Sequence, residues 1–484
     1  MLPSTSEIPS GTQANEWYNR PEIKLFAGKS TAPESPVDAL RAGVPKARAA
    51  AYLDQLQQAT FLALMDQYGE ATFARVLALK LANLAAARYH LVNRHSVLFS
   101  HPVVLRVDPA NACQLACPGC VHSENNVHAG VFDWPSTTLS VDTHDAWLTR
   151  LGPFAFCAAL YNYGEPLLNK RFAEIVRRSK EYLLYTMTST NLSLSLNNED
   201  AIVASGLDRM ILSIDGTSQE TYGRYRRKGD LDLVFKNVCA LAAAKKRVGS
   251  RTPYLVWQFL TFEHNQHQTQ DAMRLGRELG VNELRVATPF SVEWDDPTIH
   301  AVTSPDEGTY VFDGWDGKWC SSALRSGARK QAAAIDAAFS QSWTARFESV
   351  SASEDRAAPH SPTCWWLYYN LTLDGAGRIL PCCMAPNTQE KKLVFTKLRS
   401  NESRGALDLV NSDMATMARQ AFADPFGYND RASKVPADGR PYCATCAEKP
   451  ASPYNQVNIR NDIRAMDEAC VLSDDLIAQL TGGE

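Results

Sequence analysis

Short apolar runs alternate with helical patterns between residues 103 and about 290. Each run is a nearly continuous apolar block, which is typical of a strand buried on both faces. The predicted strands span 103–107, 155–161, 185–189, 209–214, 255–261 and 283–286, and the predicted helices span 143–151, 170–182, 199–205, 230–247 and 268–279. Such β-α repeats predict a parallel sheet with right-handed crossovers. Chemistry then gathers at the C-terminal ends of the strands.

The flanking segments have different patterns. Residues 1–45, rich in Pro, Ser, Gly and Thr, predict an irregular leader. Residues 46–93 predict two or three helices that pack on the next domain or cap a substrate. Residues 371–380 predict a hairpin with Asp-Gly at its turn, and 405–423 and 456–469 are helical. We therefore expect an extension (1–100), an α/β domain (101–290), a bridge (291–363) and a C-terminal domain (364–484).

Composition narrows the class of protein. The chain has 484 residues, 45% of them hydrophobic, which suffices for two or three cores. A net charge of -4 favours neither a nucleic-acid partner nor a polybasic membrane contact. The N-terminus lacks a signal-peptide pattern, and no apolar run approaches the roughly 20 residues that span a bilayer. We expect a cytoplasmic protein, in which closely spaced cysteines indicate metal more often than disulfides.

Three cysteines follow the first predicted strand in a C-x3-C-x2-C spacing. They are Cys113, Cys117 and Cys120. Three thiolates on one loop hold three irons of a cubane cluster and leave the fourth iron open. A structural zinc site with His122 as its fourth ligand is the alternative that spacing leaves open.

The chain resembles the radical S-adenosylmethionine (SAM) superfamily in several motifs that occur in the expected order. The cysteine signature comes first. Tyr163-Gly164-Glu165-Pro166 is similar to the Gly-Gly-Glu-Pro that contacts the SAM amine, and Ser189-Thr-Asn191 is similar to Thr-Asn-Gly, with Leu192 in place of the glycine. In Leu212-Ser-Ile-Asp-Gly-Thr217, the resemblance implies that Ser213 binds the SAM ribose, with Asp215 as a weaker candidate. It also implies that Arg226 pairs with the SAM carboxylate, which suits a forked guanidinium.

The resemblance implies a fold and a cofactor set. The fold is α/β, a partial (β/α)6 TIM-type barrel with a helical N-terminal extension and a small α+β C-terminal domain. The cofactors are a [4Fe–4S] cluster whose open iron binds SAM, and SAM itself. A reducing partner such as flavodoxin or ferredoxin supplies the electron that cleaves SAM to a 5′-deoxyadenosyl radical, which takes a hydrogen atom from substrate.

A second group of cysteines lies near the C-terminus. Cys364, Cys382, Cys443 and Cys446, with Gly377 between the first two, resemble the SPASM/twitch pattern. Position 452 is Ser where a full SPASM domain continues with cysteine, so the resemblance implies one auxiliary [4Fe–4S] cluster. A four-cysteine zinc ribbon is the alternative. Cys383 competes with Cys382 as ligand, Cys470 is a minor candidate for a substitute ligand, and Cys320 is either a hydrogen-atom donor or an ordinary thiol.

An auxiliary cluster that accepts electrons favours oxidation, and a thiol donor favours epimerisation. We expect a radical SAM oxidoreductase or epimerase acting on a small polar substrate such as a sugar or aminocyclitol. A peptide substrate, or a non-catalytic metal-stabilised binding protein, is the alternative. Further candidates for substrate or cofactor contacts, each with core packing or ion pairing as its alternative, are Arg106, Asp108, Tyr161, Tyr163, Gln258, His264, Asn265, Asp295 and Asp296.

Overall fold

The computed structural model describes part of the chain. The described residues are 83, 87, 90, 96–98, 100–123, 136–155, 157–250, 252–289, 296–302, 307–312, 364, 366–383, 385, 394–423 and 443. The leader, the predicted helix at 456–469 and residues Asp295, Cys320, Cys446 and Cys470 lie outside them.

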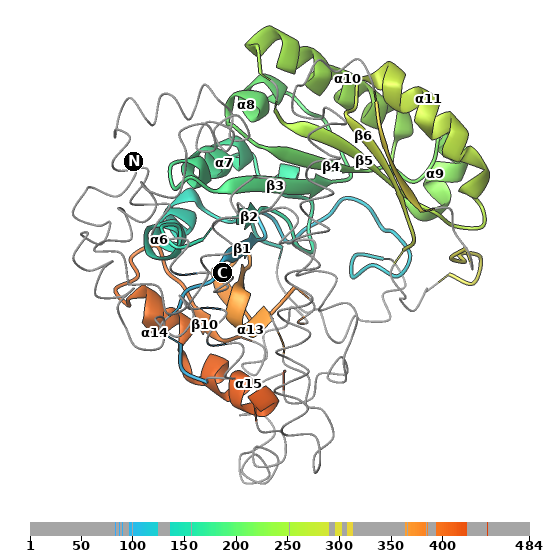
Figure 1. Cartoon of the computed structure of the whole chain (residues 1–484). Helices are drawn as coiled ribbons and strands as arrows, with labels where there is room; N and C mark the ends of the chain where they lie inside the picture. The colour runs from blue at the N-terminus through green and yellow to red at the C-terminus, as the bar shows by residue number, and fades with distance from the viewer. Residues whose placement is uncertain are drawn as a thin grey trace, which may run out of the picture.

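Six parallel strands form the centre of the fold (Figure 1). They are β1 (Val104–Val107), β2 (Cys157–Ala159), β3 (Tyr185–Thr190), β4 (Arg209–Ser213), β5 (Tyr254–Leu260) and β6 (Glu283–Ala287). Each strand pairs with the next one along the chain. This order, in which every crossover moves the same way, is that of a partial (β/α)6 barrel, so the predicted fold class is confirmed.

The helices between the strands lie together on one side of the sheet (Figure 1). They are α6 (Val141–Leu151), α7 (Phe172–Lys180), α8 (Glu199–Ala204), α10 (Leu231–Val248) and α11 (Thr269–Leu279). Side-chain caps mark where they start: the Ser140 side chain accepts from Thr143 N, and that of Asp230 from Leu233 N. Gly249 and Gly280 end α10 and α11 with φ of 70° and 76°.

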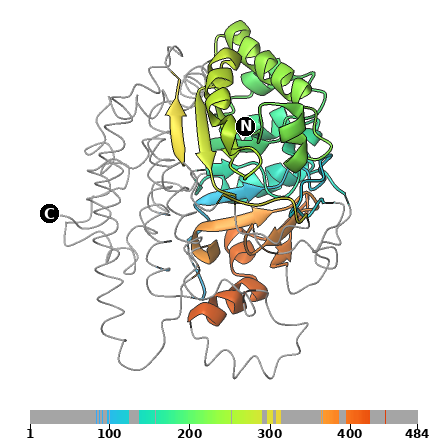
Figure 2. The same cartoon turned by 90° about the vertical axis from the view of Figure 1, so that its right-hand side faces the viewer.

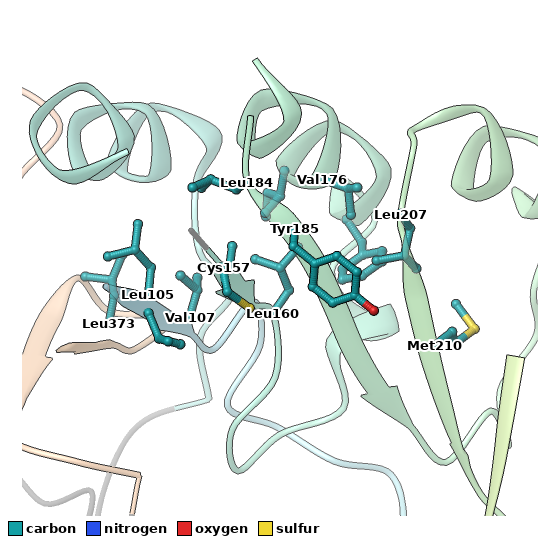
Figure 3. Close-up of a cluster of buried hydrophobic side chains, with 14 of the residues drawn as sticks. Leu105, Val107, Cys157, Leu160, Val176, Leu184, Tyr185, Leu207, Met210 and Leu373 are labelled. Atoms are coloured by element: carbon teal, nitrogen blue, oxygen red, sulfur yellow. The ribbon is translucent and has the colours of Figure 1, made fainter. Parts of the chain in front are cut away.

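The main core fills the space between these helices and the sheet. Figure 3 shows Leu105, Cys157, Leu160 and Met210 in this layer, together with Val176 of α7. Alternate strand residues point the other way, and Met187, Ile211, Tyr254 and Val256 form a separate small cluster. The inner face of the barrel therefore has its own small apolar cluster, separate from the main core.

Further strands extend the sheet at both ends. The predicted bridge contains β7 (Gly308–Val311), a strand that was not predicted from the sequence and that pairs antiparallel with β6. The predicted hairpin is confirmed as β8 (Asn370–Leu373) and β9 (Arg378–Leu380), and β10 (Thr396–Lys397) follows it. Because β8 pairs in parallel with β1, the C-terminal segment continues the barrel sheet (Figure 2).

The remaining helices are short. α9 (Gln219–Tyr225) was not predicted, and the long helix expected at 405–423 is two, α14 (Ala406–Val410) and α15 (Asp413–Ala423). A single turn, α13 (Trp366–Tyr369), precedes β8, and η1 (Pro166–Leu168) and η2 (Gln266–Gln268) are 3-10 turns.

One predicted helical region, 46–93, has three described residues, Asn83, Ala87 and His90, which are helical and buried. The side chain of Asn83 donates to the carbonyl oxygens of His101 and Phe154 at 3.0 and 3.2 Å. The expected packing of this region on the barrel is confirmed at that point.

Candidate active site

The cysteine loop leaves the C-terminal end of β1 and is held by backbone hydrogen bonds. Ala116 N donates to Arg227 O at 3.1 Å, and Cys120 N donates to Cys117 O at 3.1 Å. Gly119, the last residue before Cys120, has a φ of 71°, which glycine adopts without strain. The loop is thus tied to the end of α9 on the far side of the barrel mouth.

The signature thiols are mostly buried and near one another. Burial raises the pKa of Cys113 to about 12 and that of Cys117 to about 11, and the Arg226 guanidinium opposes the second shift. Among the described residues, no three His, Cys, Asp or Glu side chains converge to hold one metal ion. A cubane cluster binds each thiolate through a separate iron, so its ligands need not converge in that way.

Gly164 lets the end of β2 approach the cysteine loop. A Cβ at this position would lie 1.7 Å from the carbonyl oxygen of Ala110. The next residue, Glu165, donates its N–H to Ala112 O at 2.8 Å. The glycine of the motif is therefore required by the close contact of two backbones.

The buried carboxylate of Glu165 has three protein donors. Oε1 accepts from Leu167 N at 3.0 Å and from Thr190 Oγ1 at 2.7 Å, and Oε2 accepts from Asn191 N at 2.8 Å. Burial raises the pKa of Glu165, and the hydrogen bonds from Thr190 and Asn191 oppose this. A carboxylate offers about four acceptor positions, so one remains on Oε2.

The Asn191 side chain lies between the third strand and the cysteine loop. Its Nδ2 lies 3.5 Å from Cys113 Sγ, and its Oδ1 accepts from Gln114 Nε2 at 2.7 Å. Gln114 also donates to Ser193 O at 2.9 Å. Sequence reasoning missed Gln114, although a long amide inside the signature was a signal.

Leu192 shows why related motifs have glycine after the asparagine. Its φ is 55°, in the left-handed region that disfavours side chains. The Leu192 side chain is fully buried in the main core. The departure from the Thr-Asn-Gly pattern therefore keeps the backbone conformation and adds core packing.

Arg226 and Asp215 form a buried ion pair beside the signature. Arg226 Nε donates to Asp215 Oδ2 at 2.5 Å, and Arg226 Nη1 lies 4.0 Å from Cys117 Sγ. Asp215 Oδ1 accepts from Leu260 N at 2.7 Å. Both oxygens of Asp215 thus have protein partners, whereas Ser213 faces the barrel interior with its hydroxyl 3.3 Å from that of Ser189.

Several further candidates lie at the first two strand ends. The Arg106 guanidinium lies over the rings of Tyr161 and Trp366, at 5.1 and 5.2 Å. Asp108 is fully buried and accepts from Tyr163 N at 3.4 Å. Burial, with a smaller contribution from the neighbouring charge of Asp374, raises the pKa of Asp108 to about 8.

The remaining candidates lie in β5 or after it, and their contacts differ. Asn265 is structural, because its side chain bonds Phe262 N, Leu260 O and Asp215 O. His264 stacks on Phe262, and burial lowers its pKa to about 4. Gln258 faces the barrel interior. Asp296 pairs with Arg227, a contact that the sequence did not indicate.

Of the predicted auxiliary ligands, Cys364, Cys382 and Cys443 are described, as is Cys383. Cys364 precedes α13, and Cys382 follows β9. The Tyr163 hydroxyl donates to Ala385 O at 3.4 Å, and Ala385 N donates to Cys382 O at 3.4 Å. The segment of Cys382 therefore lies against the SAM motif of β2, and its role as ligand stays a prediction.

Comparison with known proteins gives a partial match. No family model matches the chain. The chain is 26% identical over 190 residues (38% of this chain, 47% of the relative) to PqqA peptide cyclase of Ruegeria pomeroyi. It is 27% identical over 142 residues (29% and 41%) to GTP 3′,8-cyclase of Limosilactobacillus fermentum. The chain thus spans less than half the length of these two curated relatives.

Solved structures are more distant. SuiB of Streptococcus suis bound to precursor peptide SuiA is 15% identical, with a TM-score of 0.41 over 73% of this chain and 72% of that one. BtrN in complex with AdoMet and 2-DOIA is also 15% identical, with a TM-score of 0.36 over 72% and 93%. These scores are too low to carry weight.

The curated relatives support the predicted resemblance, and they leave the SPASM/twitch subgroup and the individual site residues as predictions. Both relatives are radical SAM enzymes, a group that uses a [4Fe–4S] cluster and SAM. Their similarity confirms the resemblance drawn from the motifs: the chain is similar to enzymes of the radical SAM superfamily.

Proposed function

We propose that this protein cleaves SAM reductively at a cluster bound by Cys113, Cys117 and Cys120. One observation carries the proposal: the residues expected to handle SAM contact the residues expected to bind the cluster. Asn191 Nδ2 lies 3.5 Å from Cys113 Sγ, and Arg226 Nη1 lies 4.0 Å from Cys117 Sγ. The cysteines follow β1, Asn191 follows β3 and Arg226 ends α9, which follows β4, so these groups lie at the end of the strands where a barrel places its chemistry.

The side chains suit the groups of SAM. The remaining acceptor position of Glu165 fits an ammonium, and the N–H donors of Arg226 that Asp215 does not use fit a carboxylate. The Ser213 hydroxyl, on the inner face, fits a ribose hydroxyl. When bound, the cluster and SAM supply a 5′-deoxyadenosyl radical that takes a hydrogen atom from substrate.

The proposed reaction is oxidation or epimerisation of a small polar substrate. Oxidation of an alcohol to a ketone removes one hydrogen atom, then one electron and one proton. An auxiliary cluster held by Cys364, Cys382, Cys443 and Cys446 would supply the electron acceptor. The contact of Tyr163 with Ala385 supports this, because it brings the Cys382 segment to the SAM motif.

A peptide substrate is the second candidate. The relative named PqqA peptide cyclase favours it. The electron donor in either case is proposed to be a flavodoxin or ferredoxin. No helix in the described part of the chain is long and apolar enough to cross a membrane.

Anaerobic reconstitution tests the proposal. We expect about eight irons per chain with matching sulfide, and 5′-deoxyadenosine from SAM after reduction with dithionite. Replacing Cys113, Cys117 and Cys120 by Ala should abolish cleavage. The exposed thiol Cys239 provides the matched control, and Cys239→Ala should cleave SAM at the wild-type rate. Stoichiometric zinc and no cleavage would refute the proposal.

A further inference from the structure

Three polar residues on neighbouring strands, Ser213, Gln258 and Arg285, lie side by side on the inner face of the barrel. Strand register pairs Ser213 with Gln258 on β5, and Gln258 with Arg285 on β6. The neighbours of Arg285 along β6, Leu284 and Val286, belong to the main core under the helices. Alternation therefore places Arg285 on the inner face, together with Ser213 and Gln258.

The Arg285 side chain is only partly neutralised. Its Nη2 lies 3.2 Å from Glu283 Oε1, and 36% of the side chain is exposed. Within the described part of the chain, this is its one polar contact. Since a guanidinium carries five N–H donors in a fixed fork, most of the donors of Arg285 are available to a ligand.

Glu283 lies two residues before Arg285 on the same face of β6, and its carboxylate also contacts side chains of neighbouring strands. Arg209 Nη2 lies 3.5 Å from the same oxygen, Oε1, and the Tyr254 hydroxyl donates to Oε2 at 3.1 Å. Glu283 is buried, with 2% of its side chain exposed. The carboxylate therefore divides its charge between two guanidiniums, of which the side chain of Arg285 is 36% exposed and that of Arg209 is 8% exposed.

We propose that Arg285 binds an oxyanion of the substrate, a carboxylate or a phosphate, and so sets which molecules the enzyme accepts. This rests on the proposed function, because it takes the ribose of SAM to lie at Ser213. Ser213 and Arg285 stand two strand spacings apart, about 10 Å. A substrate that spans this gap carries its anionic group about one sugar ring away from the carbon that loses hydrogen.

A purely structural ion pair is the competing role for Arg285. It explains the contact with Glu283, but Glu283 is already bonded by Arg209 and Tyr254 without it. A structural pair also has no need for an arginine side chain that is 36% exposed. The two roles differ in what a small anion does, so anion binding separates them.

Isothermal titration of the reconstituted, SAM-bound protein tests the proposal. The probes are inorganic phosphate and acetate at constant ionic strength, with acetamide as the neutral control. SAM occupies Arg226, so the titration reports on another site. We expect saturable binding of at least one anion, weakened at least tenfold in Arg285→Gln and partly restored in Arg285→Lys. Arg274→Gln, at an exposed arginine of α11, should titrate like the wild type.

The outcomes separate the possibilities. Tighter phosphate binding indicates a phosphorylated metabolite, and tighter acetate binding indicates a carboxylate, including one on a peptide. Equal affinity in the wild type and Arg285→Gln, or no saturable binding of either anion, overturns the role of Arg285. Failure of the wild type to produce 5′-deoxyadenosine instead overturns the proposed function, which is measured separately.

Discussion

Replacing Gly164 by Ala should disrupt the site through a backbone clash. The new Cβ would start 1.7 Å from Ala110 O, and real Cβ atoms essentially never lie within 3.0 Å of another heavy atom. The two backbones must therefore separate by more than about 1 Å. This breaks the 2.8 Å hydrogen bond from Glu165 N to Ala112 O and moves the Glu165 carboxylate.

The magnitude for Gly164→Ala follows from these contacts. Losing a buried hydrogen bond costs about 1–3 kcal/mol, and relieving an overpacked contact costs about 1–3 kcal/mol more. We therefore expect destabilisation by about 2–6 kcal/mol. A misplacement of about 1 Å also costs up to about 100-fold in function, so SAM affinity should fall by one to two orders of magnitude.

Two assays check the Gly164→Ala variant. The thermal unfolding midpoint reports stability, and equilibrium dialysis with labelled SAM reports the Kd of the reconstituted protein. Gly223→Ala is the matched control, because the nearest atom to its Cβ is the flexible Gln219 side chain at 3.3 Å. As a helix residue it should stabilise by up to about 1 kcal/mol. A Gly164→Ala variant with wild-type midpoint and Kd would refute the reasoning.

Three further predictions concern single positions. Leu192→Gly and Leu192→Ala both lose a buried side chain, at about 2–5 kcal/mol, but only glycine relieves the left-handed backbone. Leu192→Gly should therefore be more stable than Leu192→Ala by about 1 kcal/mol and should unfold at a higher temperature. A higher unfolding temperature for Leu192→Ala would contradict the role of φ. The pKa of Asp108 is raised to about 8, chiefly by burial, so between pH 4 and 8 the folded state holds a proton that the unfolded state releases. The free energy of unfolding should fall as pH rises through this window, by up to about 1.4 kcal/mol per pH unit. The unfolding midpoint of Asp108→Asn should lack that pH dependence. Parallel pH profiles of the wild type and Asp108→Asn would contradict this role of Asp108. Replacing Cys443 and Cys446 by Ala should halve the iron content while SAM cleavage persists, and an unchanged iron count would rule out the auxiliary cluster at these residues.

The central strands and helices could be predicted because each carries its own signal. Strands buried on both faces read as apolar blocks, and β3, β4, β5 and β6 lie within one residue of the expected bounds. Strand β7 carries no such signal, since it is short and only partly buried. A sequence pattern also cannot show that β8 pairs with β1, because that contact joins residues more than 250 positions apart.

The site residues that belong to a motif could be predicted from the sequence, whereas a residue that only the strand register brings to the site could not. The cysteine loop, Glu165 and Asn191 were expected to lie together, and their contacts show that they do. Arg285 was missed because a lone arginine in a short strand resembles any surface charge. Only the register across β4, β5 and β6 brings it level with Ser213.

Asp215 shows how the contacts of a residue change its interpretation. The resemblance to the radical SAM superfamily made it a weaker candidate for binding the SAM ribose. Its carboxylate instead binds Leu260 N and Arg226 Nε, so it joins β5 to the end of α9. A buried arginine requires such a partner, because an unpaired charge there is costly. By binding Nε, Asp215 leaves the terminal nitrogens of Arg226 to face Cys117, and the fork can take a carboxylate beside the cluster. We therefore propose that Asp215 is a positioning residue, which would act on SAM through Arg226.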